Sequence, residues 1–240
     1  MNARRHPLIL GHRGLPAEAP ENTLSSFRKA LEAGADGVEL DVRLARDGVP
    51  VVVHDATMHR TTEARGTVDE LDSEEIRLCS VRWRGRAITT VHVPTLREVL
   101  KDLPPGTVVD VELKPQHGDA EMLAAAVLDA CACARDLDLV FSSFDLEALR
   151  ALQRRRPEAR LWLNCAWAAG FALRQAQRGR LQGVAFWHPL VTPWLVRHAH
   201  ELGLEVAAWP VNGPDRARTL ARWGVDTLIT DRRAVIQAFA

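Results

Sequence analysis

Short apolar runs alternate along most of the chain with longer stretches whose apolar residues have helical spacing. The apolar runs predict strands at residues 8–11, 36–42, 107–113, 138–142, 160–164, 183–187, 205–209 and 226–230. The intervening pattern predicts helices at about 24–31, 96–103, 119–135, 145–155, 167–178, 192–202, 214–223 and 232–239. Repeated strand–helix units of this kind favour an α/β protein, and eight of them favour a TIM (β/α)8 barrel.

A further apolar run at 50–54 follows the second predicted strand and indicates a β-hairpin. Asp47-Gly48 separates the two runs, and this dipeptide favours a two-residue turn. Antiparallel counting from that turn places Asp41 opposite His54, with the return strand above or beside the barrel rim. Glu39 and Asp41 are two residues apart, so they leave the same face of a strand. The pattern therefore predicts two carboxylates and an imidazole close together, although a solvated strand face would show the same alternation.

Residues 55–106 fit the strand–helix repeat less well, because glycines, prolines and threonines interrupt them. Only 96–103 has a clear helical pattern within this segment. We predict one TIM-barrel domain over residues 1–240, with 55–106 as a small insertion over one end of the barrel. Long connections in compact domains are often functional.

Composition excludes several classes of function. The chain has 240 residues, 47% of them hydrophobic, with 31 basic and 31 acidic side chains. A formal net charge of zero gives no support for nucleic-acid binding or for a charged membrane-surface protein. The N-terminus lacks the ~7–15 apolar residues of a signal peptide, and no run approaches the ~18–20 residues of a membrane span. We expect a cytoplasmic protein without stable membrane insertion, with its four cysteines reduced; the oligomeric state stays open.

Polar residues gather where the predicted strands end, which is where TIM-barrel active sites lie. The candidates are His12, Arg13, Glu39, Asp41, His54, Glu112 and Lys114. The three carboxylates, without nearby cysteines, favour Mg²⁺ or Ca²⁺ over zinc. The two histidines suit a general acid and a general base, in either order, and the two cations suit an oxyanion. This combination indicates cleavage of a phosphate ester.

Each assignment has a simpler alternative. Arg13 would pair with Glu39, and Lys114 with Glu112, if these groups were only structural. Asp231 is explained as the N-terminal cap of the last helix. Trp209 ends the seventh parallel strand and is a candidate for the pocket wall. The remaining tryptophans considered are expected to pack in the core or between helices and barrel: Trp162, Trp167, Trp187, Trp194 and Trp223.

A series of short motifs resembles the glycerophosphodiester phosphodiesterase family from end to end, in its cytoplasmic bacterial branch. The motifs are His12-Arg13-Gly14, Pro20-Glu21-Asn22-Thr23, Gly37-Val38-Glu39-Leu40-Asp41-Val42, Asp47-Gly48-Val49-Pro50, His54-Asp55, Arg60-Thr61-Thr62, Pro94-Thr95-Leu96, Glu112-Leu113-Lys114, Ser143-Phe144-Asp145 and Thr230-Asp231. The resemblance implies a TIM barrel that hydrolyses small glycerophosphodiesters, such as glycerophosphocholine, to glycerol 3-phosphate and an alcohol.

The resemblance also implies roles for individual residues. Glu39, Asp41 and Glu112 correspond to metal ligands, and His12 and His54 to the acid/base pair. Arg13 and Lys114 correspond to phosphate-binding residues, and Trp209 to an aromatic position near the glycerol. The chain departs from the family at Trp209-Pro210-Val211-Asn212, where threonine usually follows the tryptophan. Proline removes a backbone donor, which bears on the choice of alcohol more than on the reaction.

Two other functions fit the same motifs. One is a lysophospholipase D-like activity, for which the insertion would supply an apolar groove, with Val81, Trp83, Ile88 and Val91 as candidates. The other is a barrel that binds phosphate esters without turning them over.

Overall fold

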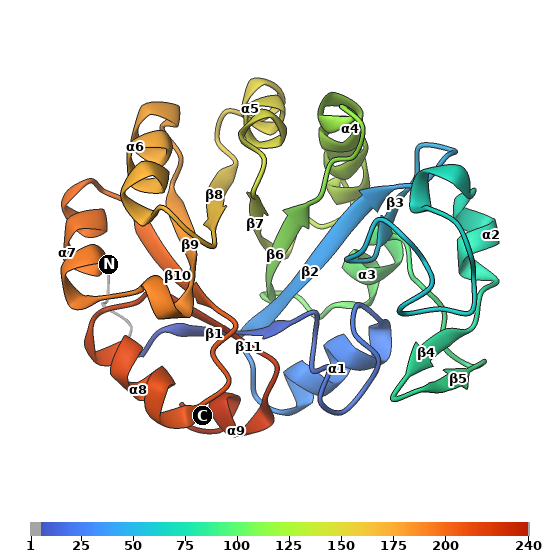
Figure 1. Ribbon diagram of the computed structural model, residues 1–240, viewed down its shortest axis with the longest axis horizontal. Coiled ribbons are helices and arrows are strands. Elements are labelled where there is room, and N and C mark those ends of the chain that lie inside the picture. Colours follow the sequence, from blue (N-terminus) through green and yellow to red (C-terminus); the bar gives the residue numbers. More distant parts are fainter. Residues whose placement is uncertain (1–5, 240) are drawn as a thin grey trace.

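Eight parallel strands close into a barrel in the computed structural model of the protein, which describes residues 6–239. The barrel strands are β1 (Leu8–His12), β2 (Gly37–Leu44), β6 (Val108–Leu113), β7 (Asp138–Ser143), β8 (Arg160–Cys165), β9 (Gly183–Trp187), β10 (Glu205–Trp209) and β11 (Thr227–Thr230). They pair in this order, and β11 pairs back with β1. Figure 1 shows the helices outside this ring. The predicted TIM barrel is confirmed.

Helices cover the outside of the barrel, one after each parallel strand or its associated hairpin. They are α1 (Leu24–Glu32), α3 (Leu96–Asp102), α4 (Ala120–Cys131), α5 (Leu146–Arg155), α6 (Ala169–Gly179), α7 (Pro193–Glu201), α8 (Pro214–Arg222) and α9 (Arg233–Ile236). Four of the eight begin at a residue whose side chain accepts from a free backbone N–H of the first turn: Thr23, Thr95, Asp145 and Thr192. At these four helices the cap marks where the strand-to-helix loop ends.

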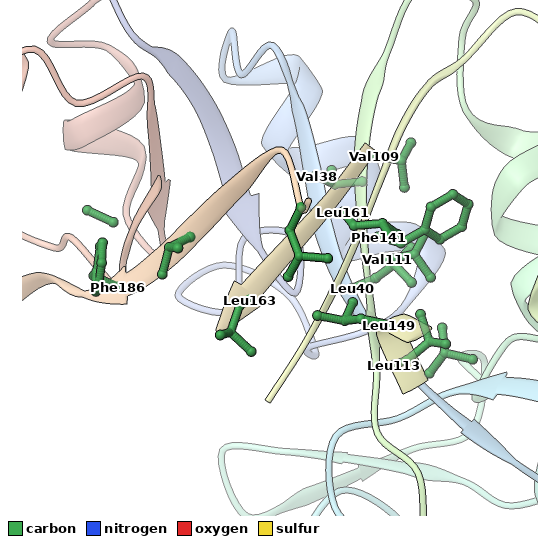
Figure 2. Packing of buried hydrophobic residues seen from close by; sticks show 14 of the residues in the cluster. Val38, Leu40, Val109, Val111, Leu113, Phe141, Leu149, Leu161, Leu163 and Phe186 are labelled. Carbon is green, nitrogen blue, oxygen red and sulfur yellow. The ribbon is translucent and has the colours of Figure 1, made fainter. Parts of the chain in front are cut away.

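The main core lies between the strands and this helical layer. Figure 2 shows alternate residues of neighbouring strands in this core, among them Val111, Phe141 and Leu161, together with Leu149 of α5. The opposite faces of the strands fill the barrel interior with a second, smaller set of side chains. Toward the mouth these inward positions change from apolar to polar or charged. The same alternation that places apolar residues in the core therefore places polar residues at the mouth.

The hairpin register is one residue away from the prediction. Strand β3 (Pro50–Val52) pairs antiparallel with β2 so that Val42 faces Val52, and Val53 N donates to the carbonyl of Asp41. Asp41 is therefore not opposite His54. The loop holds a third residue because Gly48 adopts a left-handed conformation (φ 79°) and its N–H closes a turn onto the Ala45 carbonyl, as in three-residue hairpins with a glycine bulge.

The insertion between β3 and α3 has a small core of its own. It contains η1 (Val68–Glu70), α2 (Ser73–Arg77), β4 (Val81–Trp83) and β5 (Arg86–Ile88). Met58, Val68, Ile76 and Val81 are buried together there. Residues Leu96 and Val99 of α3 pack instead into the main core. In Figure 1 the insertion lies to one side of the barrel, next to α1 and α3.

The expectation that most tryptophans are packing residues is wrong for three of them. Trp162 is fully buried inside the barrel and Trp223 packs partly against the main core. Trp167, Trp187 and Trp194 are 73%, 42% and 62% exposed. Trp167 follows β8, Trp187 is the last residue of β9 and Trp194 lies in α7, so an aromatic residue near an apolar run is not by itself a sign of burial.

Between residues 6 and 239, no helix has both the length and the apolar character needed to cross a membrane. The expectation of a cytoplasmic protein depended on the N-terminus, of which the first five residues lie outside the described part of the chain.

Candidate active site

Strand register gathers the three predicted carboxylates at the barrel mouth. Glu39 is the neighbour of His12 across β1 and β2, and Asp41 is the neighbour of Glu112 across β2 and β6. Carboxylate oxygens from Glu39, Asp41 and Glu112 all lie within 4.8 Å of one another. Parallel neighbours in register point to the same side of a sheet, which is why residues far apart in sequence meet here.

The arrangement fits a divalent cation. All three carboxylates are buried; within residues 6–239, Glu39 Oε1 has no hydrogen-bond partner, and Asp41 Oδ1 has none apart from its ion pair with Lys114. Buried oxygens without donors are costly unless a ligand satisfies them. An all-oxygen set of this kind matches the hard cations Mg²⁺ and Ca²⁺. Glu39, Asp41 and Glu112 are therefore the residues that could hold a metal ion.

The three carboxylates are not electrostatically equivalent. Burial raises the pKa of Glu39, and the charges of Asp41 and Glu112 raise it further. Burial also raises the pKa of Glu112, against the opposing effect of Lys114. Burial acts in the same direction on Asp41, but Lys114 and Arg13 outweigh it and hold the pKa of Asp41 well below its usual range. Asp41 is thus the ionised centre of the cluster.

Arg13 and Lys114 contact the same carboxylates from two sides. Arg13 Nε lies 3.1 Å from Asp41 Oδ2, while the backbone N–H of Arg13 donates to Glu39 Oε2 at 2.9 Å. Lys114 Nζ lies 2.7 Å from Glu112 Oε1 and 3.2 Å from Asp41 Oδ1. The predicted Lys114–Glu112 pair is present, whereas the side chain of Arg13 pairs with Asp41 and Glu21 and only its backbone contacts Glu39.

Each histidine is oriented by an aspartate. His12 Nδ1 lies 2.7 Å from Asp231 Oδ1, and His54 Nδ1 lies 2.7 Å from Asp55 Oδ1. A hydrogen bond from Nδ1–H to a carboxylate leaves Nε2 as the free ring nitrogen. His12 Nε2 is 3.9 Å from Glu39 Oε2, so it is directed at the carboxylate cluster. Burial is the main reason why the pKa of His54 lies below that of an ordinary histidine.

The interpretation of Asp231 as a helix cap is wrong. Helix α9 begins after Arg232, and its N-terminal residue makes no side-chain capping bond. Asp231 instead bonds His12 and accepts from Asn212 Nδ2 at 2.5 Å. Asp231 directly follows β11, a position typical of barrel-mouth residues, but the start of a helix explains an aspartate at this position equally well.

Other contributing residues were not predicted. Asn22, which precedes the N-cap Thr23 of α1, donates from Nδ2 to Asp41 Oδ2 at 2.8 Å. Asp110 faces the pocket floor, where burial raises its pKa to about 7. Its position two residues before Glu112 was the available signal. Arg43 Nε donates to the carbonyl of His54 at 2.8 Å and so fixes the backbone of that residue.

The pocket has a charged half and an uncharged half. Strands β1, β2 and β6 supply the charged groups described above. Strands β7, β8 and β10 supply Ser142, Asn164 and Trp209, and the residue after β7 supplies Phe144. Trp209 packs edge-on against Phe144, with ring centroids 5.6 Å apart, and its Nε1 donates to the Ala185 carbonyl at 2.9 Å. Trp209 lines the same pocket as the charged candidates, as the sequence predicted.

Barrel and pocket together define a TIM-barrel enzyme whose mouth holds three carboxylates, two Asp–His pairs and two cationic side chains. Comparison with known proteins narrows this class. The profile of the "Glycerophosphoryl diester phosphodiesterase family" matches residues 12–235. The chain belongs to this family of phosphodiesterases.

Relatives cover nearly the whole chain. A glycerophosphodiester phosphodiesterase of Caldanaerobacter subterraneus subsp. tengcongensis is 31% identical over 93% of this chain and 93% of its own length. An Oleispira antarctica phosphodiesterase, solved with its product sn-glycerol-3-phosphate, has a TM-score of 0.91 at 28% identity, covering 97% of this chain and 96% of that one. A Thermotoga maritima glycerophosphodiester phosphodiesterase has a TM-score of 0.80 at 27% identity, covering 99% and 98%.

Proposed function

We propose that the protein hydrolyses glycerophosphodiesters to glycerol 3-phosphate and an alcohol, with a divalent cation and two histidines. The observation that carries the proposal is the pair of Asp–His contacts on either side of the β2 carboxylates. Glu39, Asp41 and Glu112 would hold Mg²⁺ or Ca²⁺, which when bound would polarise a phosphoryl oxygen. Family membership and the carboxylate cluster support this assignment.

The remaining chemistry belongs to the chain itself. Arg13 and Lys114 bind the phosphate oxygens and limit their rotation. One histidine removes the proton of the attacking oxygen at Nε2, and the other delivers a proton to the leaving alkoxide. Asp231 and Asp55 keep each imidazole in the tautomer that this requires. Trp209 and Phe144 exclude water on the uncharged side, next to the glycerol.

The test is release of glycerol 3-phosphate from glycerophosphocholine by purified protein, with MgCl₂, with CaCl₂ and after treatment with a chelator. His12→Ala should reduce kcat about 10²–10⁴-fold, the usual contribution of a general acid or base. His59→Ala is the matched control, because His59 is an exposed histidine of the insertion. Full activity in His12→Ala, or turnover that resists the chelator, contradicts the proposal. Phosphate binding without turnover would support a non-catalytic barrel instead.

A second candidate substrate is a lysophospholipid, and the exposed aromatic residues favour it. Four aromatic residues at or just after the ends of the consecutive strands β7, β8 and β9 are each more than two-fifths exposed: Phe144, Trp167, Phe171 and Trp187. The insertion does not supply the predicted groove, because Val81 is buried in its own core and Trp83 Nε1 donates to the Pro16 carbonyl. If the rim binds an acyl chain, Trp167→Ala and Trp187→Ala should raise KM for lysophosphatidylcholine and leave KM for glycerophosphocholine unchanged.

We also propose a cytoplasmic location. The four cysteines are free in the structure, and burial raises the pKa of the Cys131 thiol to about 12, which keeps it unreactive.

A further inference from the structure

Arg60, in the insertion, connects two parts of the active site that do not contact each other directly. Its guanidinium donates twice to Glu21, with Nη1–Oε2 and Nη2–Oε1 distances of 2.8 Å each. Its Nε donates to Asp55 Oδ2. Because all three nitrogens lie in one rigid plane, these contacts fix the two carboxylates relative to each other.

The Glu21 contact leads to the phosphate-binding side of the site. Glu21 Oε1 also accepts from Arg13 Nη1 at 2.9 Å, so it lies between two guanidinium groups. Arg13 has a left-handed backbone (φ 54°), and its side chain reaches Asp41 as well as Glu21. Glu21, together with Asp41, therefore holds the guanidinium of Arg13 in place when no phosphate oxygen binds it.

The Asp55 contact leads to the acid/base side. Asp55 uses one oxygen for His54 Nδ1, at 2.7 Å, and the other for Arg60. Burial opposes ionisation of Asp55, but the hydrogen bonds from Arg60 and His54 outweigh it and lower its pKa to about 2. Arg60 thus keeps Asp55 in the one orientation that directs the imidazole of His54 toward the pocket.

The backbone of Arg60 is itself well anchored. It lies in a turn between Met58, which is fully buried in the insertion core, and Thr62, whose N–H and Oγ1 both donate to the Met58 carbonyl at 3.0 and 2.8 Å. The side chain is 43% exposed, so its ion pairs are screened and add little to stability. Geometry, rather than binding energy, is what this residue contributes.

We propose that Arg60 is a positioning residue through which the insertion sets the orientation of both His54 and Arg13. The inference rests on the proposed function. It assigns the insertion a part in catalysis although none of its own residues lines the pocket beyond the hairpin. The consequence is specific: losing Arg60 should impair the chemical step through Asp55 and phosphate affinity through Glu21.

The experiment measures kcat and KM for glycerophosphocholine at saturating divalent cation, together with Ki for inorganic phosphate. Asp55→Asn should lower kcat about 10–100-fold and leave Ki within about twofold, as for other residues that orient a ligand or base. Glu21→Gln should raise Ki several-fold, with a smaller effect on kcat. Arg60→Ala should do both, with roughly a tenfold loss in kcat. Arg60→Lys should restore only part of the kcat and of the phosphate affinity that Arg60→Ala loses, because an ammonium group cannot reproduce the planar fork of a guanidinium.

Double variants separate a shared route from independent effects. Arg60→Ala added to Asp55→Asn should reduce kcat no further, and added to Glu21→Gln should raise Ki no further, because each pair acts through the same contact. The proposal would be overturned if, in both pairs, the fold-change of the double variant equalled the product of the fold-changes of the two single variants.

Arg46→Ala is the matched control. Arg46 also ties the insertion to the hairpin, with Nη2 2.7 Å from Asp72 Oδ2 and 3.0 Å from Glu75 Oε2, but away from the pocket. It should change the melting temperature as Arg60→Ala does, with kcat and Ki unchanged. Arg60→Ala behaving like Arg46→Ala would show a merely structural role. An inactive wild type would contradict the proposed function, whereas the phosphate affinities of the Arg60 and Arg46 variants would still decide this inference.

Discussion

Replacing Glu39 with glutamine should stabilise the metal-free protein while abolishing its activity. Glu39 is the carboxylate of the cluster with the poorest compensation: Oε1 has no hydrogen-bond partner among the described residues, and Oε2 accepts only the backbone N–H of Arg13. Asp41 and Glu112, by contrast, have Lys114 at 3.2 and 2.7 Å. A glutamine of nearly the same shape removes the charge and adds a donor that faces two carboxylates.

The size of the effect follows from the local charge balance. Three carboxylates and two cations leave one negative charge in excess. At 4.8 Å, the upper limit of the distances within the cluster, and an effective dielectric constant of about 20, one unit charge repels another by roughly 3 kcal/mol. In a domain of this size, each kcal/mol of unfolding free energy changes the melting temperature by about 2–4 °C. Glu39→Gln should therefore melt roughly 6–12 °C above the wild type at pH 8 without divalent cation.

The difference in melting temperature between Glu39→Gln and the wild type should increase with pH. Since the pKa of Glu39 is raised by burial and by its acidic neighbours, the folded state binds a proton that the unfolded chain releases above about pH 4.3. The free energy of unfolding contributed by Glu39 therefore falls as pH rises from that value through the folded pKa. The variant lacks this loss, so its advantage should vanish near pH 4 and grow toward pH 8.

Calorimetry or thermal fluorescence on chelator-treated protein at several pH values measures the effect. MgCl₂ or CaCl₂ should raise the melting temperature of the wild type and leave that of Glu39→Gln almost unchanged. Asp41→Asn is the opposing control: it breaks the ion pairs to Arg13 and Lys114 and should destabilise the protein. A lower melting temperature for Glu39→Gln at pH 8 without metal, or a gain that does not vary with pH, would refute the reasoning.

Three further outcomes are expected. The acidic limb of kcat/KM should lie below pH 6.5 if His54 is the base, because burial lowers its pKa; a limb above that value would exclude this role. Asp231→Asn should lower kcat about 10–100-fold, whereas Asp226→Asn, which breaks an Asp–His pair with His200 elsewhere, should not; equal losses would remove the orienting role of Asp231. Gly37→Ala places a Cβ 1.9 Å from the Val108 carbonyl oxygen and should cost roughly 3 kcal/mol by denaturant unfolding, while Gly170→Ala in α6, where the nearest atom is Arg174 Nη1 at 3.7 Å, should be near neutral.

The sequence by itself determined the barrel and the residue types of its mouth. Each predicted strand recurs within about two residues, because a strand that is buried on its outer face must present an apolar residue at every second position. That same alternation placed Glu39 and Asp41 on one face of the second strand, and Glu112 and Lys114 on one face at the end of the third. The prediction that these side chains share a face is correct because it depends only on the two-residue repeat of a strand, which is local in sequence.

The sequence did not predict the contacts that depend on tertiary structure. The hairpin register shifted by one residue because Gly48 could adopt a left-handed conformation, which the dipeptide signal alone does not specify. Asp231 read equally well as a helix cap, and only closure of β11 onto β1 brings it to His12. Arg60 lies 39 residues from Glu21 and carries no local pattern that names its partner. A sequence records spacing along the chain, whereas these contacts depend on which strand ends the closed barrel places side by side.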